Sequence, residues 1–154
     1  MPRVHVVLES PLSPEAALAT AYDFSPRRAR VFPAVSMKRL TVHERGEKWA
    51  DVTEGTMAGL VVNWERCRYD WSQPGCVRAT VTDSNIYAVP GSSWEMRASG
   101  ADAGSRVEMT WDREFRPGPK GNFFGFFFGW QGDRIFGKYA RDVLRNRERL
   151  EHPR

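Results

Sequence analysis

The sequence predicts an α+β fold in which a curved antiparallel sheet of seven strands wraps round one long C-terminal helix. Apolar and polar residues alternate over much of residues 36–115, which is typical of strands that bury one face. Short turn signals separate these segments, and connections this short join antiparallel neighbours. After residue 130 the apolar spacing changes to three and four, which indicates an amphipathic helix.

The length and composition predict one domain that spans the whole chain, residues 1–154. A hydrophobic fraction of 41% with 27% charged residues is typical of globular proteins. No apolar run reaches the ~18 to 20 residues of a membrane span, and the first residues lack the apolar segment of a signal peptide. We therefore expect a cytoplasmic protein without stable membrane insertion.

The first elements follow from capping signals. Val4–Leu8 is apolar and rich in β-branched residues, so we expect a strand there. Ser13 caps a helix that has Pro14 in its first turn and runs to about Tyr22. A second Ser–Pro pair at residues 25–26 predicts a short helix that ends before residue 33, another proline.

Six strands are expected in succession between residues 36 and 115. The breaks that delimit them are Arg45–Glu47, Met57–Gly59, Ser72–Gly75, Val89–Gly91 and Gly100–Gly104. If Asp102 and Ala103 form a two-residue turn, the facing pairs are Ala98 and Val107, Met96 and Met109, Trp94 and Trp111, and Arg97 and Glu108. One face of this hairpin is then apolar and the other holds an opposite-charge pair, so both faces favour the same register.

The last element is a helix that ends near Glu151. Its apolar side contains Ile135, Phe136, Tyr139, Ala140, Val143, Leu144 and Leu150, and its polar side contains Arg134, Arg141, Arg145 and Glu148. Such a helix must cover an apolar surface. The concave face of the sheet is the surface that the sequence offers.

A segment rich in glycine and phenylalanine, Gly121–Gly132, precedes this helix. Glycine at every third or fourth position permits close backbone approach but weakens a helix by roughly 1 kcal/mol per position. The segment could be a moving gate or a kinked first turn packed into the core. A lid that dips into a membrane is a third interpretation, although the segment is too short to span a bilayer.

Charge and cysteine content restrict the partners. The 23 basic and 19 acidic residues are interleaved, with a net charge of +4. The basic runs Arg27–Arg30 and Arg141–Arg149 are interpreted as solvated helix faces, so no nucleic-acid partner is expected. Cys67 lies in the middle of a predicted strand and Cys76 at the hairpin tip beyond it, about 14 Å away and too far for a disulfide, and two free thiols fit a reducing compartment. A homodimer is left open.

No metal and no cofactor are expected. The three histidines are scattered and no Cys-x-x-Cys pair occurs, so the sequence shows no set of residues with ligand spacing.

The order of elements resembles the START/Bet v 1-like helix-grip superfamily, also called SRPBCC, and within it the bacterial polyketide cyclase/dehydrase branch. The likeness spans nearly the whole chain and rests on fold-level patterns rather than on a catalytic signature. The segments that carry it are Trp64–Arg66, Tyr69–Trp71 with Pro74, Val81–Asn85, Gly91–Glu95 and Val107–Trp111.

The resemblance implies a cavity between sheet and terminal helix that holds a lipid, a polyketide or another hydrophobic small molecule. Proteins of this superfamily use such a cavity for transport or sensing, or for cyclisation or dehydration. The superfamily has no universal catalytic residue, so the resemblance assigns no catalytic role in this chain.

Strand alternation gives independent candidates for polar groups in the cavity. With Arg66, Arg68 and Asp70 outside, Glu65, Tyr69 and Trp71 point inward, and a loop over residues 72–76 places Asp83 opposite Glu65. Arg113 shares the face of Trp111. Glu65, Asp83 and Tyr69 could act as acid or base, with Arg113 stabilising an enolate. Alternatively, Arg113 neutralises the carboxylates, or they lie at the wet mouth of the cavity.

The apolar lining is expected to be aromatic. Isoleucine occurs only at positions 86 and 135, and wide flat side chains in a curved sheet tend to leave a slot. The expected ligand-binding residues are Tyr69, Trp71, Trp94, Met96, Met109, Trp111, Phe123, Phe127 and Trp130. A solid aromatic core is the alternative interpretation.

Three functions are consistent with the sequence. The first is binding of a hydrophobic small molecule for transport, sensing or sequestration. The second is a cofactor-independent cyclase or dehydratase that uses acid and base residues of the same cavity. The third is a protein-interaction module without a pocket. A continuous cavity of a few hundred Å³ would favour the first two.

Overall fold

A computed structural model describes residues 3–58 and 61–153, and within these ranges it contains one sheet and three α-helices. The strands are β1 (Arg3–Ser10), β2 (Thr41–Arg45), β3 (Trp49–Ala58), β4 (Val61–Asp70), β5 (Cys76–Ser84), β6 (Ser93–Ala101) and β7 (Gly104–Asp112). The helices are α1 (Pro14–Tyr22), α2 (Arg28–Val31) and α3 (Pro119–Glu151), with a 3₁₀ turn η1 (Met37–Arg39). The predicted order of strand, two helices, six strands and long helix is confirmed.

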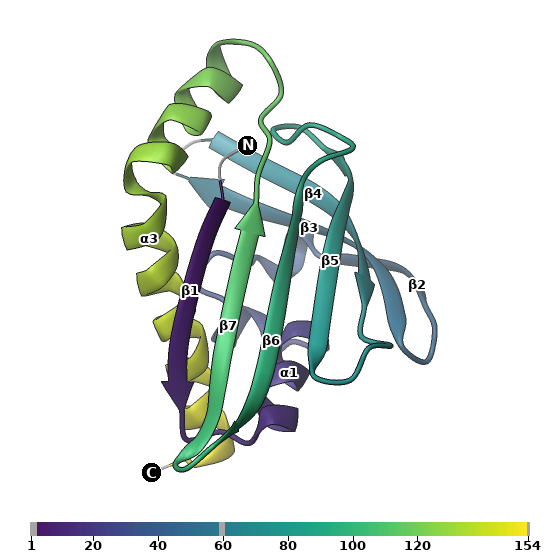
Figure 1. Ribbon diagram of the computed structural model, residues 1–154. Coiled ribbons are helices and arrows are strands. Elements are labelled where there is room, and N and C mark those ends of the chain that lie inside the picture. The colour runs from purple at the N-terminus through teal and green to yellow at the C-terminus, as the bar shows by residue number, and fades with distance from the viewer. Residues whose placement is uncertain (1–2, 59–60, 154) are drawn as a thin grey trace.

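The seven strands form one antiparallel sheet in the order β1-β7-β6-β5-β4-β3-β2. The first strand therefore lies beside the last, and β2 forms the other edge. Figure 1 shows the sheet curving away from its β1 edge, with α3 running along that edge and α1 near the lower ends of the central strands. The buried core lies between the concave sheet face and the helices.

The register of the β6–β7 hairpin agrees with the sequence prediction. Trp94 pairs with Trp111, Met96 with Met109, Ala98 with Val107, and Arg97 with Glu108 on the other face. Trp94 and Trp111 are both buried. The two-residue turn and the apolar face of the hairpin both require this register.

The β4–β5 register differs from the prediction at one point. Glu65 pairs with Ser84, and Asp83 pairs with Arg66, because a β-bulge lies where the pairing passes from Arg66 to Cys67. A bulge adds one residue to one strand and reverses the alternation beyond it. Asp83 therefore points to the outer face, and Ser84 takes the inward position.

The glycine- and phenylalanine-rich segment forms the first turns of α3 and not a separate element. Gly132 explains part of its composition, because a Cβ at that position would lie 2.9 Å from Cγ2 of Val4. Glycine thus lets α3 pack closely on β1. The idea that this segment moves as a gate stays a prediction.

Three local features are the cap of α1, the two cysteines and the end of β3. Ser13 caps α1 by accepting a hydrogen bond from the backbone N–H of Ala16. Cys67 and Cys76 are both free and buried. Strand β3 continues through residues 57 and 58, where the sequence predicts a turn, and Gly59 of that turn lies outside the described residues.

No helix in residues 3–58 and 61–153 combines the length and apolarity needed to cross a bilayer. Within the same ranges, no three His, Cys, Asp or Glu side chains gather as a metal site would require.

Candidate functional site

A cavity of about 370 Å³ lies between the concave sheet face and α3. Its walls are largely aromatic, and they include Trp64, Trp94, Trp111, Phe115, Phe128 and Phe136. Several of these rings contact one another, as Trp111 and Phe136 do with centroids 4.8 Å apart. The curvature of the sheet keeps α3 from filling the space between them.

Six of the nine expected ligand-binding residues line this cavity: Tyr69, Trp94, Met96, Met109, Trp111 and Phe127. The other three do not. Trp71 directly follows β4 and stacks on Tyr22 with a centroid distance of 4.8 Å. Phe123 and Trp130 lie on the exposed side of α3, because they occupy the helical phase opposite the inward-facing Phe128.

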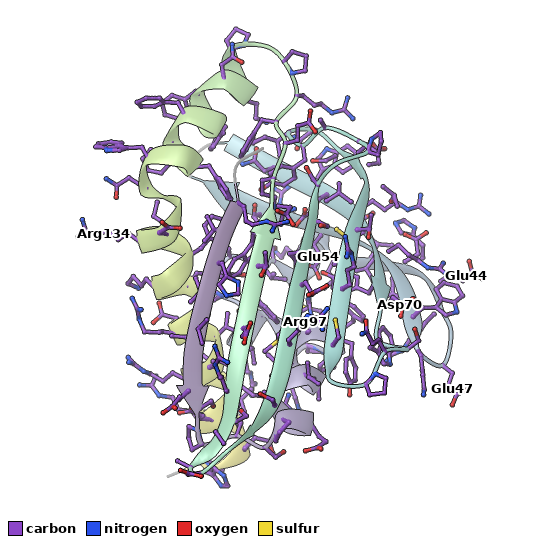
Figure 2. All side chains as sticks on the ribbon, in the orientation of Figure 1. Glu44, Glu47, Glu54, Asp70, Arg97 and Arg134 are labelled. Atoms are coloured by element: carbon purple, nitrogen blue, oxygen red, sulfur yellow. The ribbon has the colours of Figure 1, made fainter. Side chains whose placement is uncertain are left out.

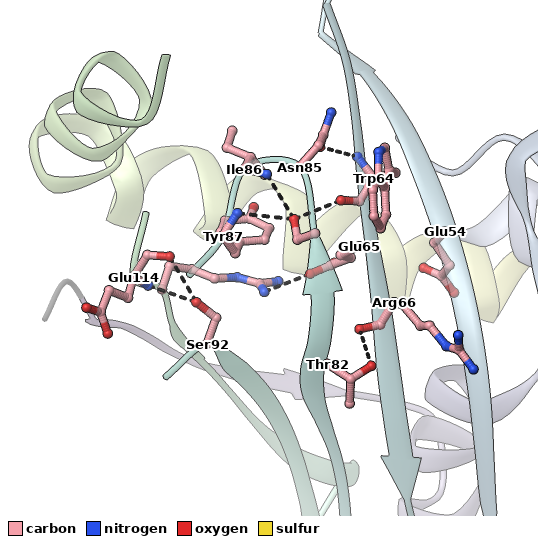
Figure 3. Close-up of polar contacts among 12 residues, drawn as sticks. Glu54, Trp64, Glu65, Arg66, Thr82, Asn85, Ile86, Tyr87, Ser92 and Glu114 are labelled. Carbon is pink, nitrogen blue, oxygen red and sulfur yellow. Dashed lines mark hydrogen bonds and ion pairs between the residues drawn. The ribbon is translucent and has the colours of Figure 1, made fainter. Parts of the chain in front are cut away.

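Two carboxylates face each other across neighbouring strands inside the cavity. Glu54 on β3 pairs directly with Glu65 on β4, and both line the cavity. Figure 3 shows the two side chains on adjacent strands. Like charges this close repel each other unless each one is compensated.

Arg28 compensates Glu54. Its Nε lies 2.6 Å from Glu54 Oε1, and the side chain of Arg28 is only 1% exposed. Nη1 donates to the carbonyl oxygens of Ala21 and Asp23, and Nη2 donates to the Tyr69 hydroxyl. The Tyr69 hydroxyl in turn donates to Glu54 at 3.4 Å. Helices α1 and α2 thus place a buried cation against the concave face of the sheet.

The guanidinium of Arg28 is also enclosed by aromatic rings. Its central carbon lies 4.7 Å from the ring centroid of Phe24 and 4.5 Å from that of Phe32. Such cation–π contacts partly replace the water that the cation has lost.

Arg113 compensates Glu65 in the same way from the end of β7. Its Nη1 donates to Glu65 Oε2 at 2.9 Å, and its guanidinium lies 4.3 Å from the ring centroid of Tyr87. Arg113 is 4% exposed. The second charge pair therefore sits against an aromatic wall, as the first does.

Burial and neighbouring charges fix the protonation of these groups. Burial, the largest single effect, lowers the pKa of Arg28, yet the charge and hydrogen bond of Glu54 together with Tyr69 and Tyr139 outweigh it and leave the pKa above its ordinary value. Burial is also the largest single effect on Arg113, but Glu65, Tyr87 and Cys67 together outweigh it, so the pKa of Arg113 is likewise raised. Burial, reinforced by Glu54, raises the pKa of Tyr69 well above its ordinary value. Both guanidinium groups are therefore charged and the phenol is protonated at neutral pH.

The structure brings together three of the four acid/base candidates. Glu65, Tyr69 and Arg113 line the cavity. Asp83 does not: its side chain is 58% exposed on the outer face, where it lies 3.4 Å from Arg116. The bulge in the β4–β5 pair is the physical reason for this error.

Sequence reasoning missed Arg28 and Glu54. The charge pattern of Arg27–Arg30 predicts a solvated helix face, but Arg28 is buried. Glu54 could have been found, because it continues the inward alternation of Ala50 and Val52 along β3. Nothing in the local sequence of α2 shows that the partner of Arg28 lies on a later strand.

The site can hold an apolar molecule and present polar atoms to it. Each carboxylate has its own guanidinium, so the charges cancel in two pairs. The carboxylates can accept protons, and the guanidinium groups can donate hydrogen bonds to an oxygen atom. Groups of this kind can catalyse acid–base chemistry on a carbonyl compound. They can equally hold the polar part of a bound ligand without any reaction.

No protein-family model and no curated protein matches the sequence. Solved structures do match. TTHA0849 from Thermus thermophilus is 13% identical with a TM-score of 0.78, over 97% of this chain and 99% of that one. The Zhui aromatase/cyclase from Streptomyces sp. R1128 is 16% identical with a TM-score of 0.77, over 98% of this chain and 96% of that one.

A START superfamily protein from Mycobacterium smegmatis is 12% identical with a TM-score of 0.74, over 96% of this chain and 98% of that one. Identities this low establish the fold and not the activity. The chain therefore shares its fold with the START superfamily protein and the Zhui aromatase/cyclase, which is the helix-grip fold that the sequence resembles.

Proposed function

We propose that the protein binds a hydrophobic small molecule in the cavity, for transport, sensing or sequestration. The observation that carries this proposal is a space of about 370 Å³ with aromatic walls around two compensated charge pairs. Pockets that bind small molecules are mostly apolar with a few placed polar groups, and their usual volumes begin at about 300 Å³. The existence of the cavity favours this function over an interaction module without a pocket.

The charge balance of the cavity favours an uncharged ligand. Both cations already have a carboxylate partner, so a charged ligand would leave one buried charge unpaired, which is costly. Among the described residues, Nε of Arg113 has no hydrogen-bond partner, so this guanidinium has donor capacity to spare. A carbonyl or hydroxyl oxygen on a largely apolar skeleton fits these properties.

Native mass spectrometry of protein purified from its own host tests the proposal. We expect a bound apolar molecule on the wild-type chain. Thr56→Trp places bulk inside the cavity, which Thr56 lines, and should abolish this adduct. Thr80→Trp adds the same bulk at an exposed position of β5 and should retain it. Equal occupancy in the two variants would contradict binding in the cavity.

A second candidate function is a cyclase or dehydratase of the polyketide-tailoring type. The specific observation that favours it is the direct pairing of Glu54 with Glu65 beside Tyr69, which offers an acid and a base on one surface. Arg113 would stabilise an enolate oxygen. The bound molecule distinguishes the two functions: an enzyme converts it, and Glu65→Gln stops conversion while keeping binding. A binding protein releases the molecule unchanged.

A further inference from the structure

Four aromatic side chains on α3 are exposed to solvent next to the cavity. Phe123, Phe126 and Trp130 are 65%, 72% and 68% exposed, and Phe127 is 40% exposed. They contact mainly one another, as the stacked pair Phe123 and Phe127 shows. A cluster of large exposed apolar side chains indicates an interaction surface, whereas single exposed apolar residues do not.

Basic residues continue the same face of the helix. At 100° per residue, Phe123, Trp130, Arg134 and Arg141 project within an arc of about 40°. A surface groove along α3 is lined by Phe127, Trp130, Gln131, Arg134, Ile135, Lys138 and Arg141, without an acidic residue. Lys138 pairs with Asp142 at the border of this face. In Figure 2 the side chain of Arg134 points away from the body of the molecule.

The face is continuous with the cavity. Phe127 and Ile135 line both the cavity and the groove on the outer side of α3. They form the wall between the two, and no other described element covers their outer side, since both are at least 40% exposed. These two side chains therefore stand between the cavity and any surface that is held against this face.

We propose that this aromatic–basic face of α3, Phe123 to Arg141, docks the protein on the surface of an anionic lipid bilayer. Exposed aromatic rings enter the headgroup region, and basic residues on the same face attract anionic lipids. The helix lies on the bilayer and does not cross it. A second copy of the chain fits the face less well, because it would bring a second cationic stripe of Arg134 and Arg141 to the first.

Flotation with two kinds of vesicle tests the docking surface on the full chain. Wild-type protein should float with phosphatidylcholine vesicles that contain phosphatidylglycerol, and much less with phosphatidylcholine alone. Arg134→Gln with Arg141→Gln should lower the affinity for the anionic vesicles about 30-fold, from about 1 kcal/mol per basic residue near such a surface. The matched control, Arg78→Gln with Arg97→Gln, removes two exposed charges from the outer sheet face and should float like wild type.

A second pair of substitutions tests the aromatic part. Phe126→Ser with Trp130→Ser should lower the affinity for both kinds of vesicle by about tenfold or more. Both side chains are largely exposed, so thermal unfolding should be unchanged. The cavity ligand seen by native mass spectrometry should stay bound to this variant, which separates a failure of docking from a failure of cavity binding.

Three results would overturn the proposal. The first is wild-type protein that does not float with anionic vesicles. The second is flotation that neither double variant reduces. The third is a dimer in sedimentation equilibrium that Phe126→Ser with Trp130→Ser dissociates while vesicle binding is absent, because the face would then be a contact between two copies.

Discussion

Replacing Arg28 with methionine tests the buried charge pairs directly. Methionine keeps much of the aliphatic volume but removes the cation 2.6 Å from Glu54 and the donors to the carbonyls of Ala21 and Asp23. Arg28 is 2% exposed, so water cannot replace it. Losing one partner of a buried ion pair costs about 3–5 kcal/mol, because the other charge stays buried without compensation.

A double-mutant cycle of Arg28 and Glu54 measures the interaction free energy between the two side chains. Glu54→Gln combined with Arg28→Met removes both charges, so the double variant should lose about 1–3 kcal/mol less than the sum of the two single variants. Urea unfolding followed by circular dichroism measures all four proteins. Arg66→Met is the matched control: Arg66 pairs with Asp51 on the outer face, is 43% exposed, and should cost less than about 1 kcal/mol. Equal costs for Arg28→Met and Arg66→Met, or strict additivity in the cycle, would refute the reasoning.

Three further predictions concern stability and reactivity. Trp94→Ala and Trp111→Ala should each cost on the order of 3–5 kcal/mol, and their direct pairing should make the double variant non-additive in urea unfolding. Burial raises the pKa of Cys67 and, less strongly, that of Cys76, so both thiols stay protonated at pH 8 and should resist a thiol reagent until urea unfolds the chain; rapid labelling of native protein would contradict this. A chain that ends at Pro119 lacks α3 and should bind a hydrophobic dye and lose near-ultraviolet dichroism, whereas a cooperative melt close to that of the full chain would show that α3 does not close the cavity.

The parts of the fold that depend on local signals could be predicted. The β6–β7 register followed from a two-residue turn and from alternation that suits both faces, and Trp94 pairs with Trp111 as expected. The cap at Ser13 is local as well. These features were accessible because each one depends on residues close together in the chain.

The site was only partly predictable because it depends on contacts between distant elements. The β5 bulge lies among polar residues 82–84, where alternation gives no sign of the reversal that turns Asp83 outward. The sequence around Arg28 is typical of an exposed helix face. Its burial depends on the ion pair with Glu54, which lies on a strand later in the chain. Whether Phe123 faces solvent depends on the residue at which α3 begins. The glycine-rich sequence does not fix that residue.

The β2 edge of the sheet has a consequence for solubility at high concentration. Within the described residues, strand β2 has a neighbour on one side only, and all five of its residues are exposed. Such an edge can recruit a strand from another molecule and start aggregation. Here the edge is short, it is interrupted by a bulge between Val42 and Glu44, and Arg45 covers the rings of Phe24 and Trp71. A foreign strand would have to match the bulge and pair beside a charged residue, so this short edge is a poor template for further strands.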